Sequence, residues 1–225
     1  QGRINKHSKS TLEIYWFQNN QTEMKILAFT DTHANKAHVK ALKKSYEKNN
    51  PDILVLAGDF TKMGKEIPKN LKDLHFGKKL LFIPGNHEEH KDFNPNLNNI
   101  ISIHKDKFIF NNILFLGCGG GFRGFTEKNL EDSKNELRKM INTFRKKTKN
   151  GKIVFVTHRP PHGNNCDYMD EINEHVGAKN IRKFITENKI DLSLCGHIHE
   201  CFGKSDQIGK TLIINPGPSG SIIEV

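Results

Sequence analysis

Five short apolar runs, each followed at once by polar residues of the kinds that bind metal ions, constrain this chain's fold more than any other feature. The runs are rich in Ile, Leu, Val and Phe and are bounded by Gly, Pro, Asn or His, which predicts buried strands. The predicted strands span residues 24–30, 52–57, 80–84, 152–156 and 191–195. In open α/β sheets, ligands bind outside the carboxyl ends of the strands. We therefore expect the five polar islands to meet at one end of the fold.

The islands supply carboxylate, amide and imidazole groups and no thiolate. The candidate metal ligands are Asp31, His33, Asp59, Asn86, His158, His197 and His199. These donors suit borderline divalent metals such as Mn, Fe, Zn or Ni. Seven ligands are too many for one tetrahedral ion, but they suit two ions about 3.5 to 4 Å apart that share one carboxylate. Asp59 is the best candidate for the shared carboxylate.

Two islands contain ligand pairs separated by one residue, Asp31 with His33 and His197 with His199. In an extended segment the members of such a pair project to the same side. Each pair is therefore expected to bind one metal, or to divide between two.

The ordered motifs D-x-H, G-D, G-N-H-E, H and G-H-x-H resemble those of the calcineurin-like metallophosphoesterases, and the resemblance extends over most of the chain. It implies a mixed α/β (α+β) fold in which a two-sheet β-sandwich is flanked by helices. The metal centre would lie above a central βαβαβ unit. The closing segments, including Asn215-Pro216-Gly217, also resemble a subset of small single-domain members that are mostly described as phosphodiesterases or phosphoesterases.

The family resemblance also implies a role for each island residue. The first metal would be held by Asp31, His33, Asp59 and His199. The second metal would be held by Asp59, Asn86, His158 and His197. His87 would stand beside the metals as an acid that is not a ligand.

Each island also has a structural explanation when it is taken alone. Asp31-Thr32-His33 could cap a helix, because Asp and Thr accept hydrogen bonds from the first helical amides. Gly85-Asn86-His87-Glu88 could form a turn. Gly196-His197-Ile198-His199 is harder to explain in this way, because two imidazoles on one face need buried partners or solvent. Taken together and in order, the islands favour a metal site.

Three further residues are candidates for substrate binding. Arg159 follows a candidate ligand, and its planar guanidinium could hold a phosphate oxygen or remain a solvated loop charge. His162 and His175 lie near islands, although a histidine that simply titrates at the surface is the commoner case. The glycine cluster of residues 117–124 lacks the Lys-Ser/Thr ending of a nucleotide-binding P-loop, so we expect a tight loop near the mouth of the site.

The predicted activity is metal-dependent hydrolysis of a small phosphoester by a metal-bound hydroxide at a dinuclear centre, with manganese as one candidate metal. His87 would protonate the leaving group. We expect phosphodiesters to be preferred. The alternatives are a phosphomonoesterase, a nuclease, or a non-catalytic scaffold on the same fold.

Composition adds limits on partners and localisation. The 225 residues carry a net charge of +10, but the lysines are interleaved with acidic residues along predicted helices, so nucleic acid is only weakly supported as a partner. No apolar run of 18 residues and no signal-like segment is present, and the four cysteines show no C-x-x-C spacing. We therefore expect a cytoplasmic protein without membrane association, whose oligomeric state is open.

We expect residues 1–23 to be an N-terminal extension and residues 24–225 to form the metallophosphoesterase domain. This extension could be native, or part of it, Gln1 and Gly2 in particular, could be a remnant of protein production. Helices are predicted over residues 34–49, 127–150 and 177–188. Residues 100–104, 108–110 and 113–116 are predicted to form short antiparallel strands of a second sheet.

Overall fold

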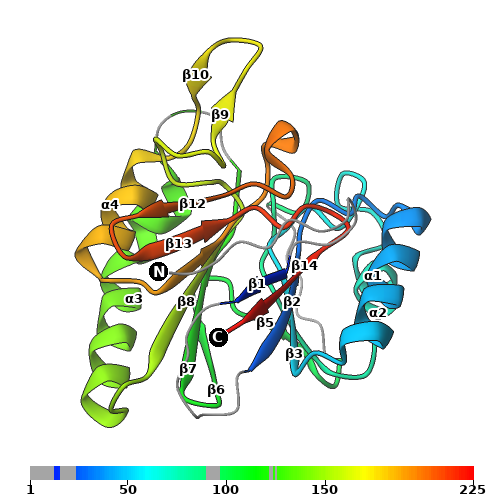
Figure 1. Cartoon of the computed structure of the whole chain (residues 1–225), viewed down its shortest axis with the longest axis horizontal. Coiled ribbons are helices and arrows are strands. Elements are labelled where there is room, and N and C mark those ends of the chain that lie inside the picture. Colours follow the sequence, from blue (N-terminus) through cyan, green and yellow to red (C-terminus); the bar gives the residue numbers. More distant parts are fainter. Residues whose placement is uncertain (1–12, 16–23, 90–96, 122–123, 125) are drawn as a thin grey trace.

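Two six-stranded sheets pack face to face and contain all five motif strands (Figure 1). This computed structural model describes residues 13–15, 24–89, 97–121, 124 and 126–225. In spatial order, the first sheet contains β1 (Glu13–Tyr15), β14 (Ser221–Glu224), β2 (Lys25–Phe29), β3 (Ile53–Leu56), β4 (Lys79–Phe82) and β5 (Ile100–Ser102). The second contains β12 (Ser205–Ile208), β13 (Thr211–Ile214), β11 (Leu192–Leu194), β8 (Lys152–Thr157), β7 (Ile113–Cys118) and β6 (Lys107–Phe110).

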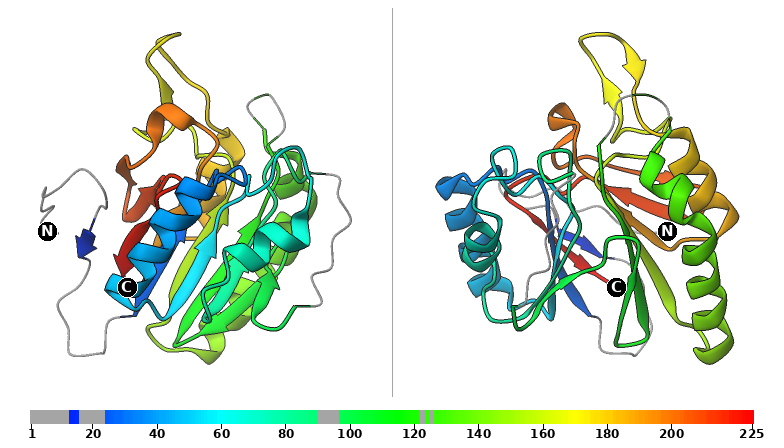
Figure 2. Two further views of the ribbon diagram at one scale, coloured as in Figure 1. Left: turned by 90° about the vertical axis from the view of Figure 1, so that its right-hand side faces the viewer. Right: turned by 180° about the vertical axis from the view of Figure 1, so that it is seen from behind.

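The motif strands are apolar on both faces because both faces are covered. In β2, Ile26 and Ala28 pack into the core between the sheets, whereas Leu27 and Phe29 pack toward the outer helices. Helices α1 (Lys36–Asn49) and α2 (Ile67–Asp73) cover the first sheet, and α3 (Lys128–Lys147) and α4 (Lys179–Glu187) cover the second (Figures 1 and 2). The result is four layers, with helices outside and sheets inside.

The predicted fold class is confirmed. Strands β2, β3 and β4 are parallel neighbours joined through α1 and α2, which makes the expected βαβαβ unit. The helix predicted over residues 127–150 is α3, and Glu127 caps it by accepting a hydrogen bond from the amide of Asn129. The helix α2 was not predicted from the sequence.

One strand prediction was wrong. Strand β5 pairs in parallel with β4 in the first sheet, and it is neither antiparallel nor part of the second sheet. Strands β6 and β7 do form an antiparallel pair in the second sheet, and β7 also runs parallel to β8. A short apolar run predicts a buried strand, but it does not predict whether the neighbouring strand runs parallel or antiparallel. That direction depends on the connections between the strands.

Of the extension predicted for residues 1–23, only β1 is among the described residues, and it pairs in parallel with β14. All four cysteines are buried thiols. Among the helices that the structure describes, none is long and apolar enough to cross a membrane.

Candidate metal centre

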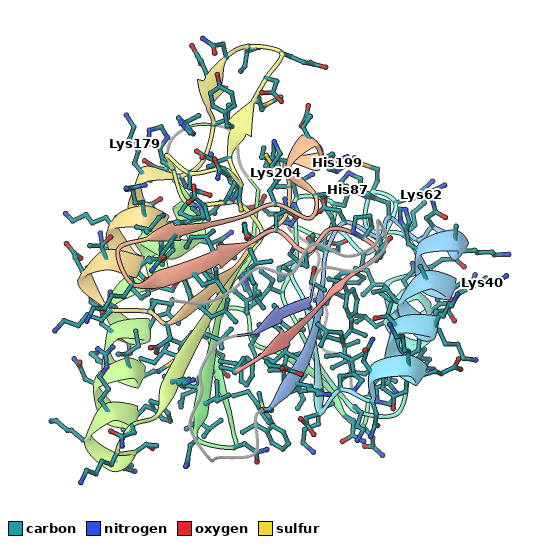
Figure 3. The ribbon with its side chains drawn as sticks, in the orientation of Figure 1. Lys40, Lys62, His87, Lys179, His199 and Lys204 are labelled. Atoms are coloured by element: carbon teal, nitrogen blue, oxygen red, sulfur yellow. The ribbon has the colours of Figure 1, made fainter. Side chains whose placement is uncertain are left out.

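The carboxyl ends of five strands from both sheets deliver the predicted ligands to one end of the sandwich. Asp31, Asp59 and Asn86 follow the first-sheet strands β2, β3 and β4, whereas His158 and His197 follow β8 and β11 of the second sheet. His199 opens a short 3-10 helix, η1 (His199–Cys201). Figure 3 labels His87 and His199 at this end of the molecule, and His33 lies within 3.3 Å of His87 and 3.4 Å of His199. The expected convergence of the islands is confirmed by these positions.

The backbone at the ligands is turned, not extended. Asp31 and His33 have φ of 51° and 47°, and Asp59 and His197 have φ of 51° and 70°. The expectation that the ligand pairs lie on extended segments is therefore wrong. Left-handed backbone at non-glycine residues is costly and persists where surrounding contacts impose it, often at functional sites. Here it turns each loop sharply after its strand, which aims the side chain across the end of the sheet.

One group of donors gathers around Asp31. Its Oδ1 atom is buried and has no hydrogen-bond partner among the residues that the structure describes. The Nε2 atoms of His199, His33 and His158 lie 3.4, 3.7 and 4.0 Å from it. The other oxygen, Oδ2, accepts hydrogen bonds from the Thr30 hydroxyl at 2.7 Å and the His197 amide at 3.0 Å. The carboxylate is thus anchored through one oxygen while the other faces three imidazole nitrogens.

A second group gathers around the side-chain oxygen of Asn86. His158 Nε2 lies 3.1 Å from this Oδ1 atom, and His197 Nδ1 lies 2.9 Å from it. His158 points its Nδ1 at the Ala57 carbonyl 2.8 Å away, so Nδ1 carries the hydrogen and Nε2 faces the donors. A backbone partner that fixes the tautomer in this way is typical of a metal-binding histidine. The His197/His199 pair therefore divides between the two groups.

Asp59 lies between the two groups. Its Oδ2 atom is 3.5 Å from His158 Nε2 and 3.9 Å from His87 Nε2, and its Oδ1 accepts the His87 amide at 2.9 Å. Asp59 shares one candidate ligand cluster with Asp31 and His158, and another with His33 and His87. Among the described residues, Asp31 is the other carboxylate that belongs to two such clusters.

The electrostatics follow from burying two carboxylates beside four imidazoles. Burial opposes the charged form of His158, but the carboxylates of Asp59 and Asp31 outweigh it and raise its pKa to about 10. Burial also opposes ionisation of Asp59, yet His158 lowers the Asp59 pKa well below its ordinary value. For His197, burial and the charge of His158 together lower the pKa to about 3. The centre therefore holds concentrated negative charge that a cation can neutralise.

These residues fit divalent metal ions. Two donor atoms that are each about 2.1 Å from one ion lie roughly 3 to 3.5 Å apart, and several of the contacts above have this spacing. His33 Nε2 and His199 Nε2, for example, are 3.4 Å apart. Atoms that offer electron pairs therefore face each other across this distance. The Oδ1 atom of Asp31 faces the nitrogens of His199, His33 and His158 in the same way. A cation between the donors would satisfy them together.

Glu88 is a functional residue whose role sequence reasoning missed. It is buried, and its Oε2 atom accepts the amides of Asp59 and Gly85, both at 3.0 Å. Its Oε1 atom accepts the amide and the hydroxyl of Thr61 at 2.9 and 2.5 Å. Glu88 thus fixes the Asp59 loop against the Asn86 loop. The motif G-N-H-E contained the residue, but its partners Asp59 and Thr61 are 29 and 27 positions away and no local pattern reveals them.

Glycines let the loops approach this closely. A Cβ atom at Gly196 would overlap the side chains of Thr30 and Asp31, and one at Gly85 would overlap Asp59. The predicted glycine loop also lies where it was expected, since a Cβ atom at Gly121 would meet the Asn86 side chain at 2.6 Å. Any larger residue at Gly196 or Gly85 would displace a ligand.

The three predicted substrate-binding residues differ in their surroundings. Arg159 is buried, and its Nη2 atom donates to the carbonyls of Gly124 and Val176. Burial lowers the pKa of Arg159, while Glu127 raises it in part. His162 and His175 are partly exposed and lie beside the buried carboxylate of Asp167. Their roles toward a substrate stay predictions.

Comparison with known proteins agrees with this geometry. A family model for calcineurin-like phosphoesterase matches residues 24–201. The chain is 34% identical over 209 residues to uncharacterized protein MJ1162 of Methanocaldococcus jannaschii, covering 89% of this chain and 91% of that protein.

Solved structures share the fold at low sequence identity. The protein TT1561 of Thermus thermophilus superposes with a TM-score of 0.66 at 17% identity, over 87% of this chain and 90% of that one. A dimetal phosphatase from Danio rerio superposes with a TM-score of 0.57 at 12% identity, over 89% of this chain and 86% of that one. The family's members are hydrolases of phosphoester bonds that use divalent metals. On the match over residues 24–201, this chain belongs to the calcineurin-like phosphoesterase family.

Proposed function

We propose that this protein hydrolyses phosphodiesters with two divalent metal ions that share Asp59. The position of Asp59 carries the proposal. Its carboxylate belongs to one candidate ligand cluster with Asp31 and His158 and to another with His33 and His87. A carboxylate with candidate ligands on both sides suits a shared ligand. The likeness in fold to a protein described as a dimetal phosphatase supports the number of ions, two.

The remaining ligands divide between the two ions according to the two groups. Asp31, His33 and His199 would complete the first set, and Asn86, His158 and His197 the second. When bound, the two ions would lower the pKa of a water molecule and polarise the phosphoryl oxygens. Manganese, iron, zinc and nickel all suit these donors. His158 must lose its extra proton to act as a ligand, so metal binding releases protons.

His87 is the candidate acid for the leaving group. Its ring is partly exposed, with Nδ1 3.0 Å from the Thr61 carbonyl and Nε2 3.9 Å from Asp59 Oδ2. Its backbone amide is tied to Asp59, so the ring stays beside the shared carboxylate. A protonated imidazole at this position can donate to the departing ester oxygen as negative charge develops on it.

Charge favours a diester substrate. A diester is a monoanion and a monoester at neutral pH is largely a dianion, so the diester brings less negative charge against the attacking hydroxide. Preference for nitrophenyl phosphate over bis(nitrophenyl) phosphate with every metal tried would instead make the protein a phosphomonoesterase. Steeply salt-dependent binding and cleavage of DNA or RNA would make it a nuclease.

The variant Asp59→Asn tests the shared ligand. A neutral amide would replace a charge that two cations share, so we expect metal content to fall from about two ions per chain to one or fewer, with hydrolysis lost in parallel. Metal is measured by mass spectrometry after dialysis, and hydrolysis with bis(nitrophenyl) phosphate and Mn²⁺.

Asp73→Asn provides the matched control, because Asp73 is exposed at the end of α2. Full occupancy and normal turnover in Asp59→Asn would remove Asp59 as the shared ligand. Wild-type protein that retains no metal would favour a non-catalytic scaffold.

A further inference from the structure

A second buried carboxylate, Asp167, organises the loop that follows the ligand His158. Asp167 is fully buried and belongs to none of the candidate ligand clusters among the described residues. Its hydrogen-bond donors are the amides of Gly163 at 2.9 Å, Asn164 at 2.7 Å and Gly177 at 3.0 Å, and Nδ1 of His175 at 2.8 Å. Three amides and one imidazole therefore stabilise the charge that burial would otherwise disfavour.

The bond from His175 to Asp167 determines what the imidazole can do. A carboxylate only accepts, so Nδ1 of His175 must carry the hydrogen. In the neutral ring the far nitrogen, Nε2, is then an acceptor. The His175 side chain is 39% exposed while Asp167 is 0% exposed. One edge of the ring is thus fixed inside the protein, and the other faces outward.

Backbone contacts tie His175 to the loop that begins at His158. The Ala178 amide donates to the Pro160 carbonyl at 2.9 Å, and the His162 amide donates to the Ala178 carbonyl at 3.1 Å. Arg159 donates to the Val176 carbonyl at 3.2 Å. The segment that carries His175 is therefore held against the residues directly after a candidate metal ligand.

His175 also lies in a hairpin that stands beside the metal centre. The hairpin consists of β9 (Tyr168–Met169) and β10 (Glu174–His175), and β9 contacts η1, which begins at His199. The Cys201 thiol donates to the Tyr168 carbonyl at 3.3 Å. Figures 1 and 2 show this hairpin projecting from the end of the sandwich where η1 lies.

Two neighbouring rings restrict the His175 imidazole. The Tyr168 ring meets it edge-on at 5.0 Å between centroids, and the His162 ring does so at 5.8 Å. His162 Nδ1 also lies 3.8 Å from Asp167 Oδ2. With its own Nδ1 held, His175 has one orientation available and presents a single acceptor at a fixed place.

We infer that Asp167 is a positioning residue that fixes His175 beside the metal centre so that Nε2 accepts a hydrogen bond from a hydroxyl group on the alcohol part of the substrate. The inference rests on the proposed phosphodiester hydrolysis. A phosphate oxygen cannot donate to Nε2, so the ring recognises the organic part of the ester. The substrate class is then a diester whose alcohol carries a free hydroxyl, as in glyceryl or sugar esters.

Two matched diesters test the inference. We would compare kcat/KM for glyceryl 4-nitrophenyl phosphate and propyl 4-nitrophenyl phosphate with Mn²⁺ at pH 8.5, after subtracting the rate without enzyme. One net hydrogen bond predicts a preference of about 3- to 10-fold for the glyceryl ester in the wild-type protein. In His175→Asn the amide can still donate to Asp167 while Nε2 is lost, so the preference for the glyceryl ester over the propyl ester should vanish.

Asp167→Asn should also lose the preference, because the amides of Gly163 and Gly177 require its single oxygen and its NH2 group would then face His175. In nitrogen-resolved NMR spectra of this variant, His175 should no longer be held in the Nδ1–H form. His175→Asn keeps the inference testable even if Asp167→Asn unfolds the loop. Hydrolysis of both esters at equal rates by the wild-type protein, or a preference retained in His175→Asn, overturns the inference alone. Hydrolysis of neither ester with any divalent metal overturns the proposed function, and this inference with it.

Discussion

Two buried carboxylates, Glu88 and Asp167, hold loops in place on opposite sides of the candidate metal centre, and they do so in different ways. Each gathers backbone amides from loops that follow strands, and neither belongs to a candidate ligand cluster of the described residues. Glu88 lies on the first-sheet side, between the loops that carry Asp59 and Asn86. Asp167 lies on the second-sheet side, in the loop after His158.

The difference between them lies in their partners. Within the described part of the chain, Glu88 accepts hydrogen bonds from backbone amides and the Thr61 hydroxyl, so it fixes the loops from which the ligands project. Asp167 also accepts from the half-exposed imidazole of His175, so it fixes a side chain that faces outward. Two similar buried carboxylates thus have different roles. Glu88 holds the loops that carry the candidate metal ligands, and Asp167 orients a side chain proposed to contact the substrate.

The largest expected effect comes from His87, the residue directly before Glu88. If His87 is the general acid, His87→Ala should retain metal but slow hydrolysis of esters with alkoxide leaving groups by about 10²- to 10⁴-fold. Nitrophenyl esters should be affected less, because nitrophenolate is already a stable anion. The measurement is kcat for both ester types with metal content determined in parallel.

Two outcomes would contradict this role for His87. An equal loss on both ester types would indicate that His87 positions the phosphate. Loss of metal would indicate that His87 is a ligand, as its cluster with His33 and Asp59 also allows.

The variant Glu88→Gln tests whether Glu88 holds the loops of Asp59 and Asn86 in place for metal binding. The amide nitrogen of glutamine cannot accept the backbone hydrogens that one oxygen of Glu88 now accepts, so the Asp59 loop should loosen. Residues that orient ligands typically change metal affinity by about 10- to 100-fold, and we expect a loss of this size by metal titration. Asp167→Asn should lower metal affinity less than Glu88→Gln does. Equal losses in the two variants would contradict the proposed difference between Glu88 and Asp167.

The exposed Glu66 supplies the control for Glu88→Gln. Glu66 pairs with Lys69 across one helical turn on the surface, so Glu66→Gln should keep wild-type metal affinity. Wild-type affinity in Glu88→Gln as well would show that Asp59 and Asn86 hold their positions without the buried carboxylate.

The ligands could be predicted from the sequence because each one follows an apolar run. An apolar run such as residues 53–56 predicts a buried strand from its own composition, and the residue after it must lie at the end of a sheet. Asp59 and His158 are therefore placed by local information. The turned backbone at Asp31 and His33 could not be predicted in this way, since contacts between loops impose it.

The roles of Glu88 and Asp167 and the pairing of β5 could not be predicted, because they depend on partners that are distant in the sequence. Glu88 and Asp167 act on amides whose positions exist only after the loops have formed. Strand β5 was misplaced because pairing direction is decided by how the chain crosses between strands. The hairpin of β9 and β10 was missed because two-residue strands leave no alternation to detect.

His104 also holds a loop near the centre, but it does so as a neutral side chain, and we expect the smallest effect from changing it. Its Nδ1 atom accepts the Gly119 amide at 3.0 Å, in the glycine loop that continues to Gly121 against Asn86. Burial, with a smaller effect of Lys105, lowers the His104 pKa to about 4. An unfolded histidine titrates near pH 6.5. Between these values the unfolded chain binds the proton more readily, so His104 stabilises the fold above pH 6.5 and loses this contribution as pH falls toward 4.

The variant His104→Asn isolates that contribution, because an asparagine oxygen can still accept the Gly119 amide and does not titrate in this range. Between pH 7 and pH 5 the free energy of unfolding of the wild-type protein should fall by about 2 kcal/mol more than that of the variant. Urea unfolding of both proteins at the two pH values measures the difference, and all other titrating groups cancel in it. Equal losses in the two proteins would mean that His104 accepts a proton without breaking its bond to Gly119, and the glycine loop would then not depend on a neutral imidazole.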